Sequence, residues 1–260
     1  MRERLVVFFQ RSFAGRCLYR FVELEGLDRA LALSSRAFVA VVPLAIVATS
    51  VTPTGETLGD RLVERFSLEG EAAEAMRELF STPSEVRGAA TVVGVAALLV
   101  TCLSFARSLQ RTYERIWGLE PLGPWGILRG LAWIGGFAAW LAIVVPIRNW
   151  AYDLGDATFY AVIAVAASTL LWLFTPYVLL GGRVGWRRLL PSALAAAVGL
   201  TALTAASVFY LPRTIEQSAE AYGLIGVTFA FVTWLFASAL VIIAAAVIGA
   251  EAGRVEATRR

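Results

Sequence analysis

Six long apolar segments, separated by shorter polar ones, dominate the hydropathy pattern of this 260-residue chain. A helix crosses about 30 Å of hydrocarbon with roughly 20 residues, at about 1.5 Å per residue, so each segment is long enough to span a bilayer. We place the spans at residues 30–52, 88–106, 127–147, 157–180, 190–211 and 223–250. The pattern predicts an all-α, polytopic membrane protein with a transmembrane domain of six helices over residues 30–250.

The last segment carries the strongest signal. It has no charged residue between Gly223 and Glu251. This uncharged stretch is longer than a bilayer crossing requires, so we expect a tilted helix or a first turn in the interface. The composition agrees, because 58% of the residues are hydrophobic, a share typical of polytopic membrane proteins.

Three segments lie outside the predicted spans. In residues 1–29, apolar residues alternate with arginines at helical spacing, which indicates a cytoplasmic amphipathic helix on an anionic leaflet, with a solvated basic tail as the alternative. The 53–87 connection is rich in carboxylates, and its apolar residues also recur at helical intervals, so we expect short amphipathic helices at the external membrane surface. Residues 251–260 form a cytoplasmic tail.

The arginines predict the orientation. Sixteen of the 23 lie in the N-terminal segment, the connections 107–129 and 181–189, or the C-terminal tail, whereas six lie on the opposite side. Because short cytoplasmic loops carry the excess of basic residues, both termini are expected in the cytoplasm. Arg183, Arg187 and Arg188 form a basic cluster that enforces this topology and offers a second use in binding anionic lipids.

The residue types exclude several kinds of chemistry. A metal-dependent nuclease needs clustered ligands such as histidine and carboxylates, but the chain has no histidine and its cytoplasmic acids are scattered. No glycine-rich phosphate loop is present. The two cysteines, Cys17 and Cys102, lie in different settings, so we expect no disulfide. We therefore predict no catalytic residue, no metal site, no cofactor and no nucleic-acid partner.

Arg36 is the main candidate for a functional site, because a guanidinium inside a span costs several kcal/mol unless it is paired or faces water. Glu251 and Asp28 are its candidate partners, since both flank spans on the same side. One interpretation is an anion or headgroup contact in an inward-facing cavity. The alternative is a structural ion pair or a snorkelling arginine. The hydroxyls of Ser34 and Ser35 serve either a polar path or helix packing.

Four segments resemble the YihY/BrkB-like family of bacterial inner-membrane proteins, formerly mislabelled as ribonuclease BN. They are Asp28–Ala32 leading to Val42-Pro43-Leu44, Leu109–Gly118, Thr175-Pro176 with Trp186–Ala193, and a last span with Tyr222-Gly223, Gly226, Trp234-Leu235 and Gly249-Ala250-Glu251. At Ser35-Arg36 many members carry aromatic residues, so the chain is similar to the YhjD-like branch. The resemblance implies a six-helix fold in the inner membrane. For some members, transport or envelope-lipid export is suspected.

We therefore expect a transporter or flippase-like carrier of an anionic or lipidic envelope substrate. The alternative is a non-transporting membrane scaffold for envelope proteins, with the acidic external loop as its contact surface. The lipid bilayer is the expected partner in both cases. The candidate cavity residues are Arg36, Ser34, Ser35, Glu251, Asp28, Tyr222, Gly223 and Gly226.

Overall fold

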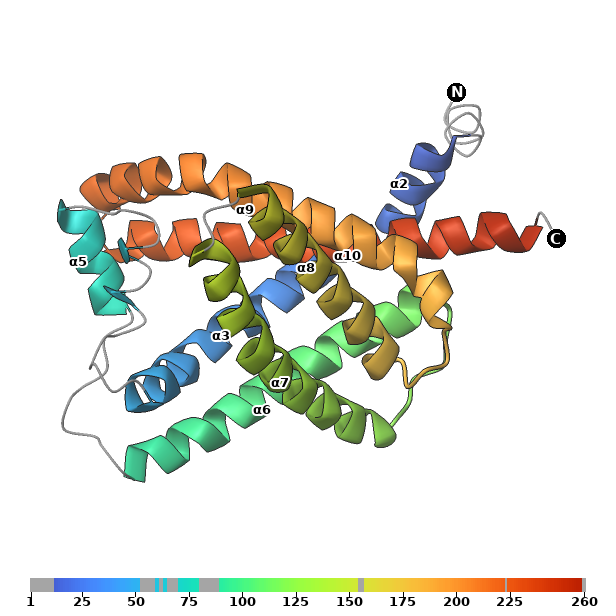
Figure 1. Cartoon of the computed structure of the whole chain (residues 1–260), viewed down its shortest axis with the longest axis horizontal. Coiled ribbons are helices and arrows are strands. Elements are labelled where there is room, and N and C mark those ends of the chain that lie inside the picture. Colours follow the sequence, from blue (N-terminus) through green and yellow to red (C-terminus); the bar gives the residue numbers. More distant parts are fainter. Residues whose placement is uncertain are drawn as a thin grey trace. The chain divides into compact units, whose positions relative to one another are not determined.

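The computed structural model describes residues 12–51, 59–60, 63–64, 70–79, 89–153, 157–222 and 224–258. Over these residues every regular element is a helix, which confirms the predicted all-α class. The helices, in chain order (Figure 1), are α2 (Phe13–Glu23), α3 (Gly26–Val51), α5 (Gly70–Leu79), α6 (Ala89–Ile116), α7 (Trp125–Asp153), α8 (Ala157–Leu179), α9 (Trp186–Tyr222) and α10 (Leu224–Thr258).

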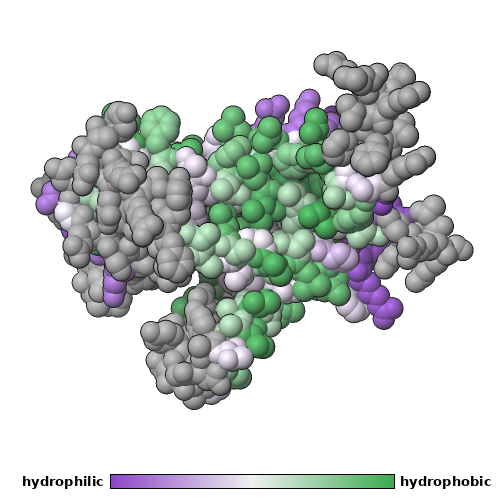
Figure 2. Space-filling view, turned by 90° about the horizontal axis from the view of Figure 1, so that it is seen from above, coloured by the Kyte–Doolittle hydropathy of each residue, from purple (hydrophilic) through white to green (hydrophobic). Residues whose placement is uncertain are grey.

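Five helices in the described part are long and apolar enough to cross a membrane. These candidate spans are Val92–Ile116, Trp125–Ile147, Ala161–Leu179, Trp186–Ser207 and Ile225–Arg254, and they correspond to the second to sixth predicted spans. The first predicted span, 30–52, falls on α3 up to Val51, but α3 is not among the five. Hydrophobic residues make up much of the coloured surface in Figure 2, which suits contact with lipid chains.

Four helices continue beyond the predicted ends of their spans. α6 runs to Ile116, α7 to Asp153, α9 to Tyr222 and α10 to Thr258, where the hydropathy pattern placed ends near residues 106, 147, 211 and 250. The pattern ends a span at the first charged residue. A charge ends the apolar stretch but leaves the backbone hydrogen bonds intact, so the helix itself continues into the polar region.

The chain divides into two compact units. The first unit comprises Met1–Leu31, Ala106–Thr201 and Ala239–Arg260, and the second comprises Ala32–Phe105 and Ala202–Ser238.

In the first unit, α7 packs against α8. The Phe174 ring of α8 lies directly over Gly136 of α7, where any larger side chain would collide with it. One turn away, the Trp133 indole Nε1–H donates to the Thr175 hydroxyl at 3.1 Å, so this buried polar pair is satisfied.

The same unit brings α9 and α10 into close contact at Gly249. A Cβ atom at this position would lie 2.7 Å from the backbone nitrogen and 2.8 Å from the Cα of Ser192 on α9. Such distances fall inside van der Waals contact, and the atoms they involve belong to backbone that cannot rotate away. The glycine therefore sets the separation of the two helices.

In the second unit, α3 meets α10 through aromatic rings. The Phe38 and Phe231 ring centroids are 6.4 Å apart, and the Phe231 ring stacks on Trp234 at 6.3 Å. The short helix α5 has its own apolar side, formed by the buried residues Ala72, Ala73, Ala75 and Met76. It lies in the 53–87 connection, for which amphipathic helices were predicted, and Glu74, Arg77 and Glu78 on it are exposed.

We predict that Gly249→Ala lowers the free energy of unfolding by about 1–3 kcal/mol, because the added methyl overpacks the contact with Ser192. The midpoint of thermal unfolding in detergent measures this change. Gly253→Ala is the matched control on the same helix, since a Cβ there meets only the Trp117 ring, at 3.9 Å. The control is expected to unfold at or above the wild-type midpoint, because alanine favours the helix. Equal midpoints for the two variants would contradict the close contact.

Candidate functional site

An open hollow lies in the second unit beside Arg36. Ala32, Ser35, Arg36 and Val39 line it from α3, and Thr101 and Ser104 line it from α6. The α3 residues follow an i, i+3, i+4, i+7 pattern and so share one face of the helix. The volume of the hollow is about 400 Å³.

The walls of the hollow are largely apolar, and its polar groups are one guanidinium and three hydroxyls. Arg36 is half-buried, and its Nη1 donates to the Ala32 carbonyl one turn earlier on α3, at 3.4 Å. This bond turns the side chain toward the N-terminal end of the helix. The Thr101 hydroxyl donates back to its own helix, to Ala97 at 2.9 Å or Leu98 at 3.0 Å. The site therefore combines one positive charge with apolar surface.

The predicted site residues have different locations. Ser35 lines the hollow with Arg36, whereas Ser34 is buried and is not one of the lining residues. Asp28 is exposed in the first turn of α3, where a carboxylate interacts favourably with the helix N-terminus. Gly226 is buried in α10. Gly223 and the Tyr222 side chain lie outside the described residues.

Glu251 forms ion pairs with three arginines within the first unit. Its Oε1 lies 3.2 Å from Arg20 Nη1 and 3.3 Å from Arg254 Nη1, and its Oε2 lies 4.0 Å from Arg16 Nε. Glu251 is buried, so the neighbouring charges offset its loss of water. The predicted pairing of Arg36 with Glu251 or Asp28 stays a prediction. Arg16 and Arg20 were assigned to a helix face by the sequence, but not to this carboxylate.

Arg20 joins three helices. While Nη1 binds Glu251 on α10, Nη2 of the same α2 side chain donates to the Ile116 carbonyl at the end of α6, at 2.7 Å. The last carbonyls of a helix have no partner within the helix, so this bond caps α6. Cys17 lies nearby: burial and the Glu251 charge raise the pKa of its thiol, and Arg16 partly opposes them. The thiol is therefore a weak nucleophile at neutral pH.

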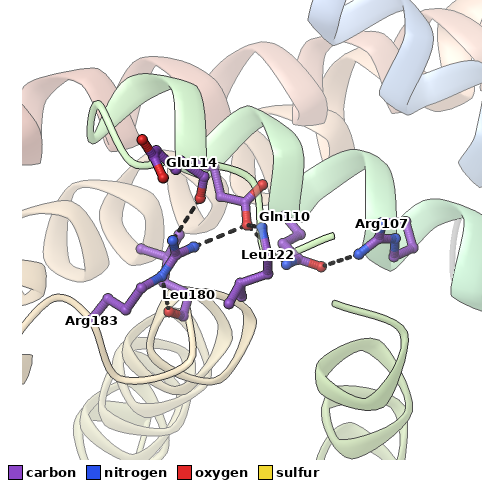
Figure 3. Close-up of polar contacts among 7 residues, drawn as sticks. Arg107, Gln110, Glu114, Leu122, Leu180 and Arg183 are labelled. Atoms are coloured by element: carbon purple, nitrogen blue, oxygen red, sulfur yellow. Dashed lines mark hydrogen bonds and ion pairs between the residues drawn. The ribbon is translucent and has the colours of Figure 1, made fainter. Parts of the chain in front are cut away.

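A second buried carboxylate, Glu114, lies near the end of α6 (Figure 3). Its Oε1 accepts three hydrogen bonds, from Arg183 Nη2 at 3.0 Å, Gln110 Nε2 at 3.0 Å and the Leu122 backbone N–H at 3.1 Å. Gln110 is fully buried, and its Oε1 accepts from Arg107 Nη1 at 3.3 Å. The network places the α6–α7 connection and Arg183 around one charge.

Arg183 uses all three of its guanidinium nitrogens in this network. Besides Glu114, it donates from Nε to the Leu180 carbonyl at 2.9 Å and from Nη1 to the Glu120 carbonyl at 2.6 Å. The sequence grouped Arg183 with Arg187 and Arg188 as a cluster that enforces the topology, with anionic-lipid binding as a second use. In the structure Arg183 connects two loops, and Arg187 lies over the Trp186 ring at 5.3 Å. Lipid binding by the cluster stays a prediction.

Glycines end the two helices that lead into this network. Gly118 after α6 has φ 65°, and Leu119 N–H bonds back to the Glu114 carbonyl at 2.8 Å. Gly181 after α8 has φ 67°, and Gly182 N–H bonds to the Tyr177 carbonyl at 2.9 Å. Both are Schellman-type ends, for which glycine is the favoured residue. They turn the chain so that Leu122 and Arg183 reach Glu114.

The structure thus explains the polar segment Leu109–Gly118. Its buried positions are Leu109, Gln110, Thr112, Tyr113, Glu114 and Ile116, whereas Arg111 and Arg115 are exposed. In the sequence, Glu114 is one of several scattered cytoplasmic acids. Its i, i+4 spacing from Gln110, on an otherwise apolar face, is the signal that could have distinguished it. No three metal-ligating side chains come together in the part of the chain that the structure describes.

Comparison with known proteins also indicates a membrane protein. The family model described as Virulence factor BrkB matches residues 17–260. A UPF0761 membrane protein of Nitrosospira multiformis is 24% identical over 255 residues, which cover 90% of this chain and 59% of the relative. Another, of Stenotrophomonas maltophilia, is 24% identical over 253 residues, covering 86% and 57%. The chain thus spans less than two thirds of either relative. No solved structure is a significant match.

We predict that Glu114→Ala lowers the free energy of unfolding by about 1–3 kcal/mol, because the buried Gln110 amide and the Leu122 N–H lose their acceptor, while the partly exposed Arg183 keeps its two carbonyl partners. Thermal unfolding in detergent measures the loss. Glu120→Ala is the control: Glu120 is exposed, and only its backbone carbonyl binds Arg183, so a change within about 0.5 kcal/mol is expected.

The double variant Glu114→Ala/Arg183→Ala tests the pairing itself. It is expected to lose less stability than the sum of the two single variants, because the ion pair that both single variants break is lost only once. Strict additivity would show that the two residues act independently.

Proposed function

The chain belongs to the Virulence factor BrkB family, and we propose that it is a transporter or flippase-like carrier of an anionic or lipidic envelope substrate. It is an integral membrane protein with several apolar helices. We further propose six spans, with α3 as the first, in the cytoplasmic membrane of a bacterium and with both termini inside. The distribution of the 23 arginines supports this orientation.

The observation that carries the proposal is the hollow around Arg36. Its volume of about 400 Å³ falls within the range of small-molecule sites, roughly 300–1,000 Å³. Its largely apolar walls suit a hydrocarbon chain, and the guanidinium suits a phosphate or carboxylate, which it binds with two parallel hydrogen bonds. An amphiphile with an anionic head matches both features at once.

The hydroxyls give the site hydrogen-bonding groups besides the guanidinium. Ser35 is the neighbour of Arg36 on α3, and Ser104 lies one turn after Thr101 on α6. Hydroxyls can donate to a headgroup and can also return to the carbonyls of their own helices when no headgroup is present, as Thr101 does. This exchange lets the polar lining remain satisfied with and without a substrate.

We predict that Arg36→Leu slows the transfer of an anionic lipid about ten- to hundredfold, the equivalent of one lost charge-assisted hydrogen-bonded contact. Proteoliposomes containing NBD-labelled phosphatidic acid, assayed by dithionite quenching, measure the rate. NBD-labelled phosphatidylcholine in the same assay tests the requirement for an anionic head. Arg36→Lys is expected to retain part of the rate, because it keeps the charge without the planar fork.

Arg111→Leu is the matched control, since Arg111 is an exposed arginine on α6 outside the hollow. It should transfer lipid at the wild-type rate. Equal rates for wild type, Arg36→Leu and protein-free vesicles would refute the carrier proposal, and the scaffold alternative would then take its place.

The orientation has its own test. In a background with Cys17→Ser and Cys102→Ala, we predict that Glu74→Cys on α5 reacts with a membrane-impermeant maleimide in intact spheroplasts. Glu120→Cys, between α6 and α7, should react only after the membrane is permeabilised. Both residues are exposed, so access from the two sides of the membrane is what differs. The reverse labelling pattern would invert the proposed topology.

A further inference from the structure

Helix α2 has an unusual distribution of charged and apolar side chains. Four large apolar side chains on it are solvent-exposed in the unit: Phe13 (41%), Leu18 (56%), Tyr19 (47%) and Val22 (68%). Leu18 and Val22 lie one turn apart, and at about 100° per residue they project from the side opposite Arg20. The N-cap Ser12, whose hydroxyl oxygen accepts from Gly15 N–H at 3.0 Å, fixes where this helix begins.

The basic residues of α2 are directed into the protein. The Arg20 side chain is only 13% exposed and binds both Glu251 and the Ile116 carbonyl, and Arg16 contacts the other oxygen of Glu251. In most interfacial helices, arginines on the polar face contact anionic headgroups. Here one buried carboxylate of α10 takes both, so little positive charge remains for lipid phosphates.

The exposed apolar residues continue beyond α2. After the short turn at Leu24 and Glu25, Leu27 and Leu31 are exposed on α3, at 60% and 56%, one turn apart. This part of α3 leads directly into the first predicted span, which begins at residue 30. The apolar residues therefore run from α2 toward the hydrocarbon, and lipid is the occupant that this continuity favours. A specific protein partner usually needs about 1,000 Å² or more of buried surface, well beyond four partly exposed side chains.

We propose that the face of α2 carrying Leu18, Tyr19 and Val22 is a bilayer-contact surface, and that Glu251 makes this contact independent of anionic lipid. The apolar side chains enter the boundary between headgroups and acyl chains, with the Tyr19 hydroxyl at the headgroup level. The Arg16–Glu251 and Arg20–Glu251 ion pairs determine which side of α2 faces the lipid. The same pairs anchor the helix to α10 and to the end of α6.

Site-directed spin labelling in nanodiscs tests this proposal. Single labels are attached through Leu18→Cys and Val22→Cys in full-length protein with Cys17→Ser and Cys102→Ala, and Glu23→Cys, an exposed polar position on the same helix, is the control. Collisions with oxygen and with a water-soluble nickel complex give the depth. We expect positions 18 and 22 about 5–10 Å below the phosphates and position 23 in water.

The lipid composition separates the apolar mechanism from an electrostatic one. When Glu251 is unchanged, the depth of the labels at positions 18 and 22 should be the same in phosphatidylcholine nanodiscs and in nanodiscs that also contain phosphatidylglycerol. Glu251→Gln frees Arg16 and Arg20 from their carboxylate, so the depths should then shift with phosphatidylglycerol. Circular dichroism and gel filtration establish that this variant is folded, and the wild-type measurement does not depend on it.

Three results would overturn the proposal. High nickel accessibility at positions 18 and 22 means that this face is in water. Low accessibility to both reagents means that a protein surface covers it. A wild-type depth that increases with phosphatidylglycerol means that anionic lipid, and not apolar contact, holds the helix.

Discussion

Two buried carboxylates, Glu114 of α6 and Glu251 of α10, connect the elements that surround the end of α6 in the first unit. Glu114 gathers Arg183, Gln110 and Leu122 N–H around one oxygen, and Glu251 receives Arg20, whose second nitrogen caps α6 at Ile116. A buried charge without partners costs several kcal/mol, so each carboxylate fixes the position of every group that satisfies it. The loops after α6 and α8, and the helices α2 and α10, therefore owe their placement to two glutamates.

The two arginine-rich features serve different purposes because their surroundings differ. Arg20 and Arg183 have their donors aligned with carboxylates and with the last carbonyls of helices, an arrangement that gives rigidity. Arg36, in the second unit, lies beside an open and largely apolar hollow, and one of its hydrogen bonds goes to the Ala32 carbonyl of its own helix at 3.4 Å. Its place beside this open hollow makes Arg36 the candidate for binding, whereas the other two are candidates for architecture.

Hydropathy and charge predicted much of the fold. Apolar segments of about 20 residues must form helices in lipid, because no other local structure satisfies the backbone there, so α6 to α10 were predictable. The ends of these helices were less predictable. α6 continues past Arg107, and α9 continues to Tyr222, because a charged residue ends an apolar stretch but not a helix. At the hollow, the sequence offers Arg36 and Ser35 as neighbours on one helix, but Thr101 and Ser104 come from α6, and only packing shows which helix faces α3.

The sequence by itself determined the helical class, the apolar spans and the family, because each rests on local composition or on an ordered set of motifs. Only the tertiary structure decided the ion pairs. The sequence offers 23 arginines as partners for any buried glutamate, and nothing local distinguishes Arg20 from the rest as the partner of Glu251, 231 positions away. That choice depends on how α2, α6 and α10 meet. All the candidate partners are arginines, so their distance from Glu251 in the folded chain, and not their side-chain type, selects the pair.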